Sequence, residues 1–218
     1  MPQKINISKS RLFVDLVDYT KIHPQLAMHR CEYVAIELAI QWKNKKDVLD
    51  FYKTSDLYIF DLTNYQLMLE HSGHVKNMIE QMKGLGVKKV LEYGGGIGEF
   101  SLFCCENGLD ITYYDLPSKT KDYALWRFKK RGGDKIQIAE SDFLGEKWDV
   151  VNIMDVLEHL EEPEPVIKKL AESAKYIFCN PENVLYNVYF TQHISKFDLT
   201  PYFEHVEGYL WKNKSLVE

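Results

Sequence analysis

Apolar residues between positions 24 and 42 recur at intervals of three or four, which is the spacing of one face of an α-helix. They are Ala27, Cys31, Val34, Leu38 and Trp42. Pro24 suits the first turn of this helix, because an amide proton has no helical partner there. Further helices are predicted for residues 46–52 and from about 64 to 83, and the glycines that follow at 84 and 86 end the second of them.

From residue 88 onward, short apolar segments alternate with helical patterns. Strands are predicted near 90–91 and at 110–114, 135–139, 148–154, 176–179, 205–210 and 215–217, and helices at 99–107, 164–174 and near 200–204. The last two strands flank the turn-like sequence Lys212-Asn213-Lys214. Strands that alternate with helices along the chain indicate an α/β fold with a mostly parallel sheet.

The helical first third is predicted to be an extension of this core. No linker rich in proline, glycine or serine separates the two parts. We therefore expect residues 1–84 to form an N-terminal helical cap and residues 85–218 to form the core. Ligands bind over the carboxyl ends of the strands in a doubly wound sheet, and helices that precede the first strand could cover that edge.

The first predicted strand runs into a glycine cluster, Gly94-Gly95-Gly96-Ile97-Gly98, which a helix follows. A strand, a glycine turn and a helix in this order are typical of a nucleotide or cofactor site. A dinucleotide fingerprint would need a sixth-position glycine, but that position after Gly94 is Glu99. A phosphate-binding P-loop is excluded as well, because no Gly-Lys-Ser/Thr follows.

The pattern that remains is Glu92, one spacer and then Gly94-x-Gly96-x-Gly98. It resembles the first motif of class I S-adenosylmethionine-dependent methyltransferases. Later segments agree in order and spacing: Asp115 ends the second predicted strand, Glu140-Ser141-Asp142-Phe143 follows the third, and Asp155-Val156-Leu157-Glu158-His159-Leu160 follows the fourth. The last of these resembles the signature of the small-molecule branch that contains ubiquinone-type O-methyltransferases. The resemblance covers roughly the C-terminal three fifths of the chain.

This resemblance implies a Rossmann-like, doubly wound sheet of about seven strands that ends in an antiparallel hairpin. It also implies S-adenosylmethionine as the cofactor and a role for each motif residue. Backbone groups of Gly94, Gly96 and Gly98 would pass along the amino acid part, with Glu92 beneath them. Asp115 would hold the ribose hydroxyls, Asp142 the adenine amino group, and Phe143 or Leu116 an adenine face, while Asp155 would border the methionyl group and the acceptor.

Several of these residues have a structural alternative. Glu92 and Asp115 could be ordinary carboxylates at strand ends, and Asp142 could cap a helix. Methyl transfer from a sulfonium needs mainly positioning and exclusion of water, so a catalytic triad is not required. His159 and His193 are the candidate bases. Each could instead be structural, His159 as part of a helix and His193 as a hydrogen-bonded residue at the sheet edge.

The favoured function is methyl transfer to a small molecule, at oxygen, nitrogen or carbon. A net charge of −5 and the absence of a basic run disfavour nucleic acid as a partner. A protein or RNA methyltransferase of the same fold, and a non-catalytic cofactor-binding or scaffold protein, stay as alternatives. The 14 tyrosines hint at a partly apolar acceptor.

Composition also bears on compartment and on metals. The four cysteines are not spaced as metal ligands, and two of them are adjacent, which fits a reducing cytoplasm. The first residues lack the apolar core of a secretory signal, and no segment is apolar enough to span a membrane. No metal site is expected, since no His, Asp and Glu cluster with ligand spacing stands out, although Asp155 and Glu158 could contribute to one.

Overall fold

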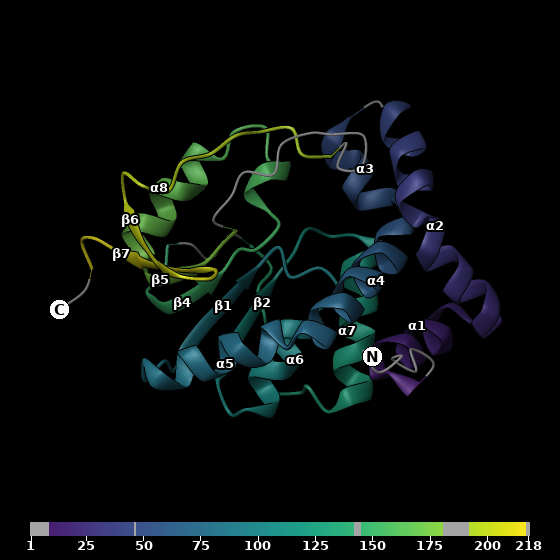
Figure 1. Cartoon of the computed structure of the whole chain (residues 1–218), viewed down its shortest axis with the longest axis horizontal. Coiled ribbons are helices and arrows are strands. Elements are labelled where there is room, and N and C mark those ends of the chain that lie inside the picture. Colours follow the sequence, from purple (N-terminus) through teal and green to yellow (C-terminus); the bar gives the residue numbers. More distant parts are fainter. Residues whose placement is uncertain (1–8, 46, 142–144, 181–191, 217–218) are drawn as a thin grey trace, which may run out of the picture.

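A computed structural model describes residues 9–45, 47–141, 145–180 and 192–216 (Figure 1). Its strands are β1 (Lys89–Tyr93), β2 (Asp110–Tyr114), β3 (Gln137–Ile138), β4 (Trp148–Asn152), β5 (Ala174–Phe178), β6 (Phe203–Glu207) and β7 (Leu210–Asn213). Its α-helices are α1 (Arg11–Thr20), α2 (Pro24–Lys43), α3 (Val48–Thr54), α4 (Leu57–Ser72), α5 (His74–Gly84), α6 (Glu99–Glu106), α7 (Lys119–Arg131) and α8 (Glu164–Ser173). Within the described ranges, no helix is both long and apolar enough to pass through a bilayer.

The strands form one seven-stranded sheet in the order β3-β2-β1-β4-β5-β7-β6. The first five strands pair in parallel, whereas β7 runs antiparallel to both β5 and β6. The predicted fold class is therefore confirmed, including the C-terminal hairpin. The strand order reverses between β1 and β4, so the carboxyl ends of these two strands define the switch point where doubly wound sheets bind ligands.

Side chains alternate between the two faces of the sheet, as the two-residue period of a strand requires. Val90 and Val150 pack with α5, α6 and α7 on one face, whereas Leu91 and Val151 pack with α8 on the other. Both faces are covered, which is why these strands are apolar along most of their length.

The helices α1 to α4 share a hydrophobic core of their own, which Ile97 and Tyr123 of the sheet region join. In Figure 1 these helices, coloured purple to blue, lie to one side of the sheet. The boundary predicted at residue 84 stays a prediction. The helix that precedes it, α5, packs on the sheet through Val75 and Met82.

Three local predictions were wrong. The helix expected from 64 to 83 is interrupted at Gly73, whose φ of 72° takes the chain out of the helical conformation and separates α4 from α5. The strands of the hairpin lie earlier than expected, because the turn forms at Gly208 (φ 55°) and the predicted turn at 212–214 partly belongs to β7. The helix expected near 200–204 is a turn that leads into β6.

Gly98 is a position where only glycine fits. Its φ is 71°, and a Cβ built there would lie 2.4 Å from the Phe128 ring. We expect Gly98→Ala to lower the free energy of unfolding by about 2 to 4 kcal/mol, from left-handed backbone strain and overpacking combined. Urea unfolding measures this effect. Gly108→Ala is the matched control, since it has a similar φ of 74° but open space around the added methyl group. Equal losses in the two variants would contradict the role given to Phe128.

Candidate functional site

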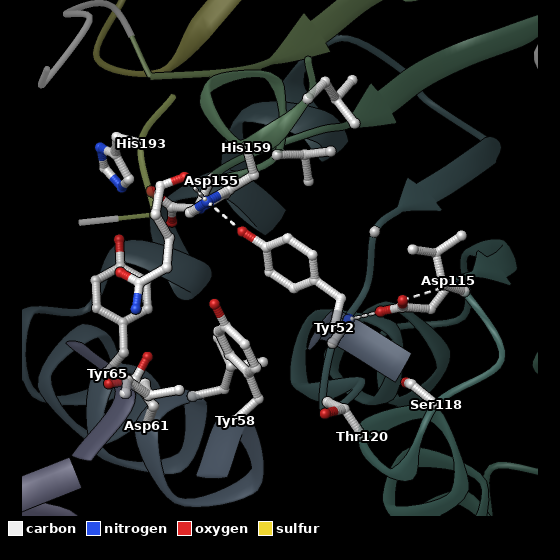
Figure 2. A pocket seen from close by; sticks show the side chains of 18 of the residues that line it. Tyr52, Tyr58, Asp61, Tyr65, Asp115, Ser118, Thr120, Asp155, His159 and His193 are labelled. Carbon is white, nitrogen blue, oxygen red and sulfur yellow. Dashed lines mark hydrogen bonds between the residues drawn. The ribbon is translucent and has the colours of Figure 1, made fainter. Parts of the chain in front are cut away.

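A cavity of about 1100 Å³ opens over the carboxyl ends of β1, β2 and β4. Its walls come from three parts of the chain: the glycine loop with the end of β2, the cap helices α2 to α4, and the segments after β4 and β5 (Figure 2). Of the residues predicted for the site, it is lined by Gly94, Gly96, Asp115, Leu116, Asp155, His159 and His193. The sheet's switch point and the predicted cofactor residues therefore coincide.

Asp115 holds the glycine loop from the end of β2. Its Oδ2 accepts a hydrogen bond from the amide of Gly96 at 2.5 Å, and its Oδ1 accepts one from the amide of Leu116 at 2.6 Å (Figure 2). Burial raises the pKa of Asp115 to about 6, although these two hydrogen bonds oppose the shift. Each carboxylate oxygen retains a lone pair that can accept from a ligand hydroxyl.

Glu92 lies beneath the loop and does not line the large cavity. It is 4% exposed and accepts hydrogen bonds from both the amide and the hydroxyl of Ser101 in α6. It borders a separate cavity of about 80 Å³, which also touches Gly94 and Asp155. Burial raises the pKa of Glu92 to about 8. Glu92 thus joins β1 to the start of α6, and its contact with a cofactor stays a prediction.

Gly94 brings the loop against the segment that follows β4. Its φ is 70°, and a Cβ there would lie 2.6 Å from a methyl group of Val156. Gly98, unlike Gly94, does not line the large cavity, because it lies beneath the loop at the start of α6.

Asp155 follows β4 in a left-handed conformation, with φ 56°. Asparagine and aspartate tolerate this region better than other residues with a Cβ, and such positions cluster at functional sites. The side-chain amide nitrogen of Asn180, which follows β5, donates to Asp155 Oδ1 at 2.6 Å. The carboxylate of Asp155 is therefore fixed at the boundary between the glycine loop and the histidines. The sequence did not predict the left-handed backbone of this residue.

The structure brings His159 and His193 together, with ring centroids 4.9 Å apart and planes at 86°. His159 Nδ1 lies 2.9 Å from the Tyr52 hydroxyl and 3.1 Å from the carbonyl oxygen of Gln192. Burial, together with the nearby His193, lowers the pKa of His159 to about 4. His159 is therefore neutral near pH 7. The predicted roles of both histidines as bases stay predictions.

Glu158 lies beside these two histidines, and the three side chains form a group that could hold a metal ion. The sequence predicted no such cluster, although it offered Glu158 as a possible ligand, because His193 lies far along the chain from Glu158 and His159.

The cap supplies a wall that sequence analysis did not identify residue by residue. Tyr52 of α3 and Tyr58 and Tyr65 of α4 line the cavity, and the rings of Tyr52 and Tyr58 lie 5.2 Å apart (Figure 2). Asp61 lies on the same wall, and burial raises its pKa to about 6. In the sequence, the high tyrosine content was the one indication of this wall, and it did not identify which tyrosines form it.

Asp142 and Phe143 lie outside the described residues, so their roles stay predictions.

Solved structures that match part of this chain include methyltransferases. Magnesium protoporphyrin IX methyltransferase from Synechocystis PCC 6803, crystallised with bound SAH, is 20% identical with a TM-score of 0.47, and the match covers 57% of this chain and 62% of that chain. A S-adenosylmethionine-dependent methyltransferase from Clostridium acetobutylicum ATCC 824 is 16% identical with a TM-score of 0.43, covering 48% of each chain.

Sequence comparison gives the family. Ubiquinone biosynthesis O-methyltransferase from Histophilus somni (strain 2336) is 33% identical over 98 residues, which are 41% of this chain and 41% of that protein. The matched region thus spans about two fifths of this curated relative. The family described as Methyltransferase domain matches residues 58–207. Because this match covers more than half of the sequence and includes the glycine loop, Asp115 and both histidines, the chain belongs to the Methyltransferase domain family.

Proposed function

We propose that this protein is an S-adenosylmethionine-dependent methyltransferase that acts on a small-molecule acceptor by in-line displacement. The observation that carries the proposal is the arrangement of Asp115, whose carboxylate fixes the glycine loop through the Gly96 amide and also lines the large cavity. Membership of the Methyltransferase domain family supports the same reaction.

The charges of the cavity suit a cationic cofactor. Its described lining includes five carboxylates and neither lysine nor arginine. The carboxylates are Asp47, Asp61, Asp115, Asp155 and Glu161. Such a lining attracts a sulfonium and repels a polyphosphate backbone. It therefore favours a small acceptor over RNA.

One group of residues along the cavity would bind the cofactor, and a second group would bind the acceptor. Asp115 would accept hydrogen bonds from the two ribose hydroxyls, and the backbone of Gly94 and Gly96 would border the amino acid part. Leu116 would lie against adenine, as would Phe143, with Asp142 near the adenine amino group. Asp155 would lie between the cofactor and the acceptor.

The tyrosine wall would hold the acceptor. Tyr52, Tyr58 and Tyr65 offer apolar ring faces and polar hydroxyls, which fits an acceptor that is partly aromatic or apolar. S-adenosylmethionine supplies a methyl group with a good leaving group, so the protein's contribution is to align the acceptor and exclude water. In the transfer, an acceptor lone pair forms the new bond to carbon while the carbon–sulfur bond breaks, and its electron pair stays on sulfur.

We also propose the cytoplasm as its compartment. The cysteines at 31, 104, 105 and 179 are all free, and three of them are buried. Unpaired thiols are the rule where glutathione and thioredoxin keep them reduced.

Calorimetry with S-adenosylhomocysteine tests the cofactor proposal. We expect one binding site per chain, followed by transfer of labelled methyl groups from S-adenosylmethionine to a component of a small-metabolite extract. Absence of binding at millimolar ligand would overturn the proposal. Binding together with labelling of protein or RNA, but of no small molecule, would overturn the acceptor class alone.

A further inference from the structure

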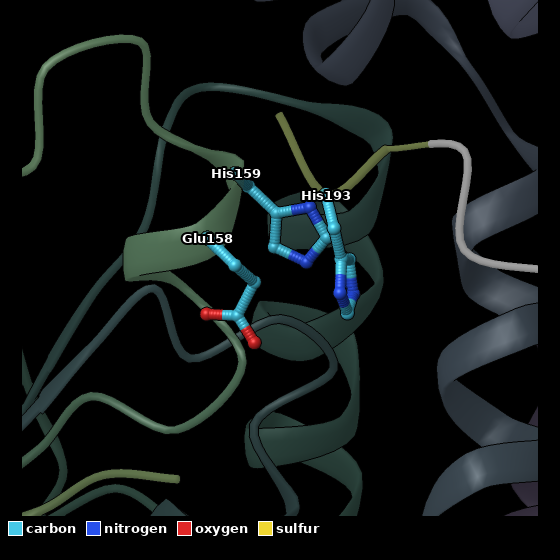
Figure 3. A group of neighbouring side chains, drawn as sticks. All are labelled: Glu158, His159 and His193. Atoms are coloured by element: carbon cyan, nitrogen blue, oxygen red, sulfur yellow. The ribbon is translucent and has the colours of Figure 1, made fainter. Parts of the chain in front are cut away.

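Three side chains that can ligate a metal converge at the acceptor end of the cavity: Glu158, His159 and His193 (Figure 3). Each offers one ligand atom, and these atoms all lie within 4.8 Å of one another. His159 and His193 line the cavity, whereas Glu158 lies behind them. The group is therefore reached from the cavity and closed on its inner side.

Glu158 has an unsatisfied carboxylate oxygen. Glu158 is 5% exposed, and its Oε2 has no hydrogen-bond partner within the described part of the chain. Its other oxygen, Oε1, receives a long hydrogen bond of 3.4 Å from the side chain of Asn180. A buried carboxylate oxygen without a donor is costly, and a bound cation removes that cost.

The contacts of His159 favour the tautomer that a metal ligand needs. A carbonyl oxygen can only accept, so the contact with Gln192 O at 3.1 Å favours a proton on Nδ1, and the Tyr52 hydroxyl, 2.9 Å from the same nitrogen, can accept from it as well. The lone pair then belongs to Nε2. Histidines that ligate metals through one nitrogen commonly donate from the other to a carbonyl or carboxylate, which fixes the ring.

Backbone hydrogen bonds bring His193 to the other two residues. The amides of Ile194 and Ser195 both donate to the carbonyl oxygen of Glu158, at 2.9 and 3.1 Å. The segment that carries His193 is thereby fastened to the segment that carries Glu158 and His159. The convergence of the three side chains follows from these main-chain contacts.

We propose that Glu158, His159 and His193 bind a divalent first-row transition-metal ion, and that its open coordination positions hold an oxygen of the acceptor. Two imidazoles and one carboxylate suit Zn²⁺, Fe²⁺, Co²⁺ or Mn²⁺ better than Ca²⁺, which prefers oxygen ligands. Metal binding itself is independent of the proposed function, whereas the role toward the acceptor rests on it.

The proposal sets a geometric requirement. Metal bonds of about 2.0 to 2.2 Å place neighbouring ligand atoms about 3 to 3.5 Å apart, so the most widely separated ligand atoms would move together by at most about 1 to 2 Å. Asn180 would support this closure, because it already donates to both Glu158 and Asp155.

A metal at this position also accounts for activation of the acceptor. A hydroxyl bound to the ion becomes more acidic, and its proton leaves to solvent. The oxygen lone pair then forms the bond to the methyl carbon as the carbon–sulfur bond breaks. The two histidines would act as ligands in this reaction, with no need for either to accept a proton.

Titration of the chelator-treated protein, free of any histidine tag, with Co²⁺ and with Zn²⁺ tests the site. We expect one ion per chain by calorimetry and a Co²⁺ absorption spectrum typical of nitrogen and oxygen ligation. Glu158→Gln and His193→Ala should each weaken binding by about 100-fold or more, since changes to residues that only orient ligands already cost 10 to 100-fold. His29→Ala is the control, because His29 is exposed on α2 and stacks on Tyr33; it should leave the affinity unchanged.

Unchanged affinity in both ligand variants, or an equal loss in His29→Ala, would overturn the proposal. Glu158→Gln is nearly isosteric, so it stays informative even if His193→Ala fails to fold. S-adenosylhomocysteine binding on the same samples separates the two proposals. Binding of the nucleoside without stoichiometric metal overturns the metal site alone, whereas the reverse result supports the metal site and overturns the proposed function.

Discussion

Asp15→Asn is expected to lower the free energy of unfolding by about 3 to 5 kcal/mol, because breaking a buried ion pair leaves its partner uncompensated. Asp15 is 0% exposed and pairs with Arg127, Arg131 and Lys130 at 3.2, 2.6 and 2.9 Å. Asparagine keeps the shape of the side chain and removes its charge. The fully buried guanidinium of Arg127 would then keep Glu99 as its charged partner among the described residues, together with its hydrogen bond to the carbonyl oxygen of Ile97.

The pH dependence of this loss has a defined sign. Burial opposes ionisation of Asp15, but hydrogen bonds from Arg131 and Lys130 and the charge of Arg127 outweigh it, so its pKa lies below the usual value of 3.8. The stabilisation is therefore present above about pH 4 and disappears as the pH falls through the lower pKa of the folded state. Urea unfolding at pH 7 and at pH 3 should show a smaller difference between variant and parent in acid.

Asp18→Asn is the matched control on the same helix. Asp18 also pairs with Lys130, but its side chain is 48% exposed, so we expect little change in stability. A loss in Asp15→Asn as small as in Asp18→Asn would show that the buried charges do not fasten the cap to the core.

Asp115→Ala is expected to weaken S-adenosylhomocysteine binding between about tenfold and 100-fold, from the loss of charge-assisted hydrogen bonds to the ribose. The substitution also removes the hydrogen bond that the Gly96 amide donates to Asp115 at 2.5 Å. The glycine loop then lacks the contact that fixes it to the end of β2. Calorimetry at pH 7.5 measures the change in affinity. Asp122→Ala provides the control, since Asp122 is an exposed carboxylate on the following helix and does not line the cavity.

Acid should weaken the same interaction in the parent protein. Burial raises the pKa of Asp115 to about 6, so the carboxylate becomes protonated as the pH falls through this value. Affinity should therefore decrease between pH 7.5 and pH 5, and less so in Asp115→Ala. Equal affinities of variant and parent at pH 7.5 would remove Asp115 from the cofactor site.

Local patterns predicted much of the core correctly. The helix that begins at Pro24, the strand at 110–114 and the glycine loop were all placed from residue spacing, because helix and strand periods and glycine requirements act over a few residues. Element ends were less well predicted. Gly73 and Gly208 each redirect the chain, and their effect on α4 and on the hairpin depends on packing as well as on residue type.

Short segments of the sequence were enough to predict most strands and helices in their order along the chain, the glycine loop and the carboxylate at the end of β2. Tertiary packing brings distant segments together. It placed Tyr52 of the cap against His159, buried Asp15 against Arg127, and fastened the segment of His193 to the carbonyl of Glu158. These contacts depend on the path of the whole chain around the sheet, and no periodicity within a segment carries that information.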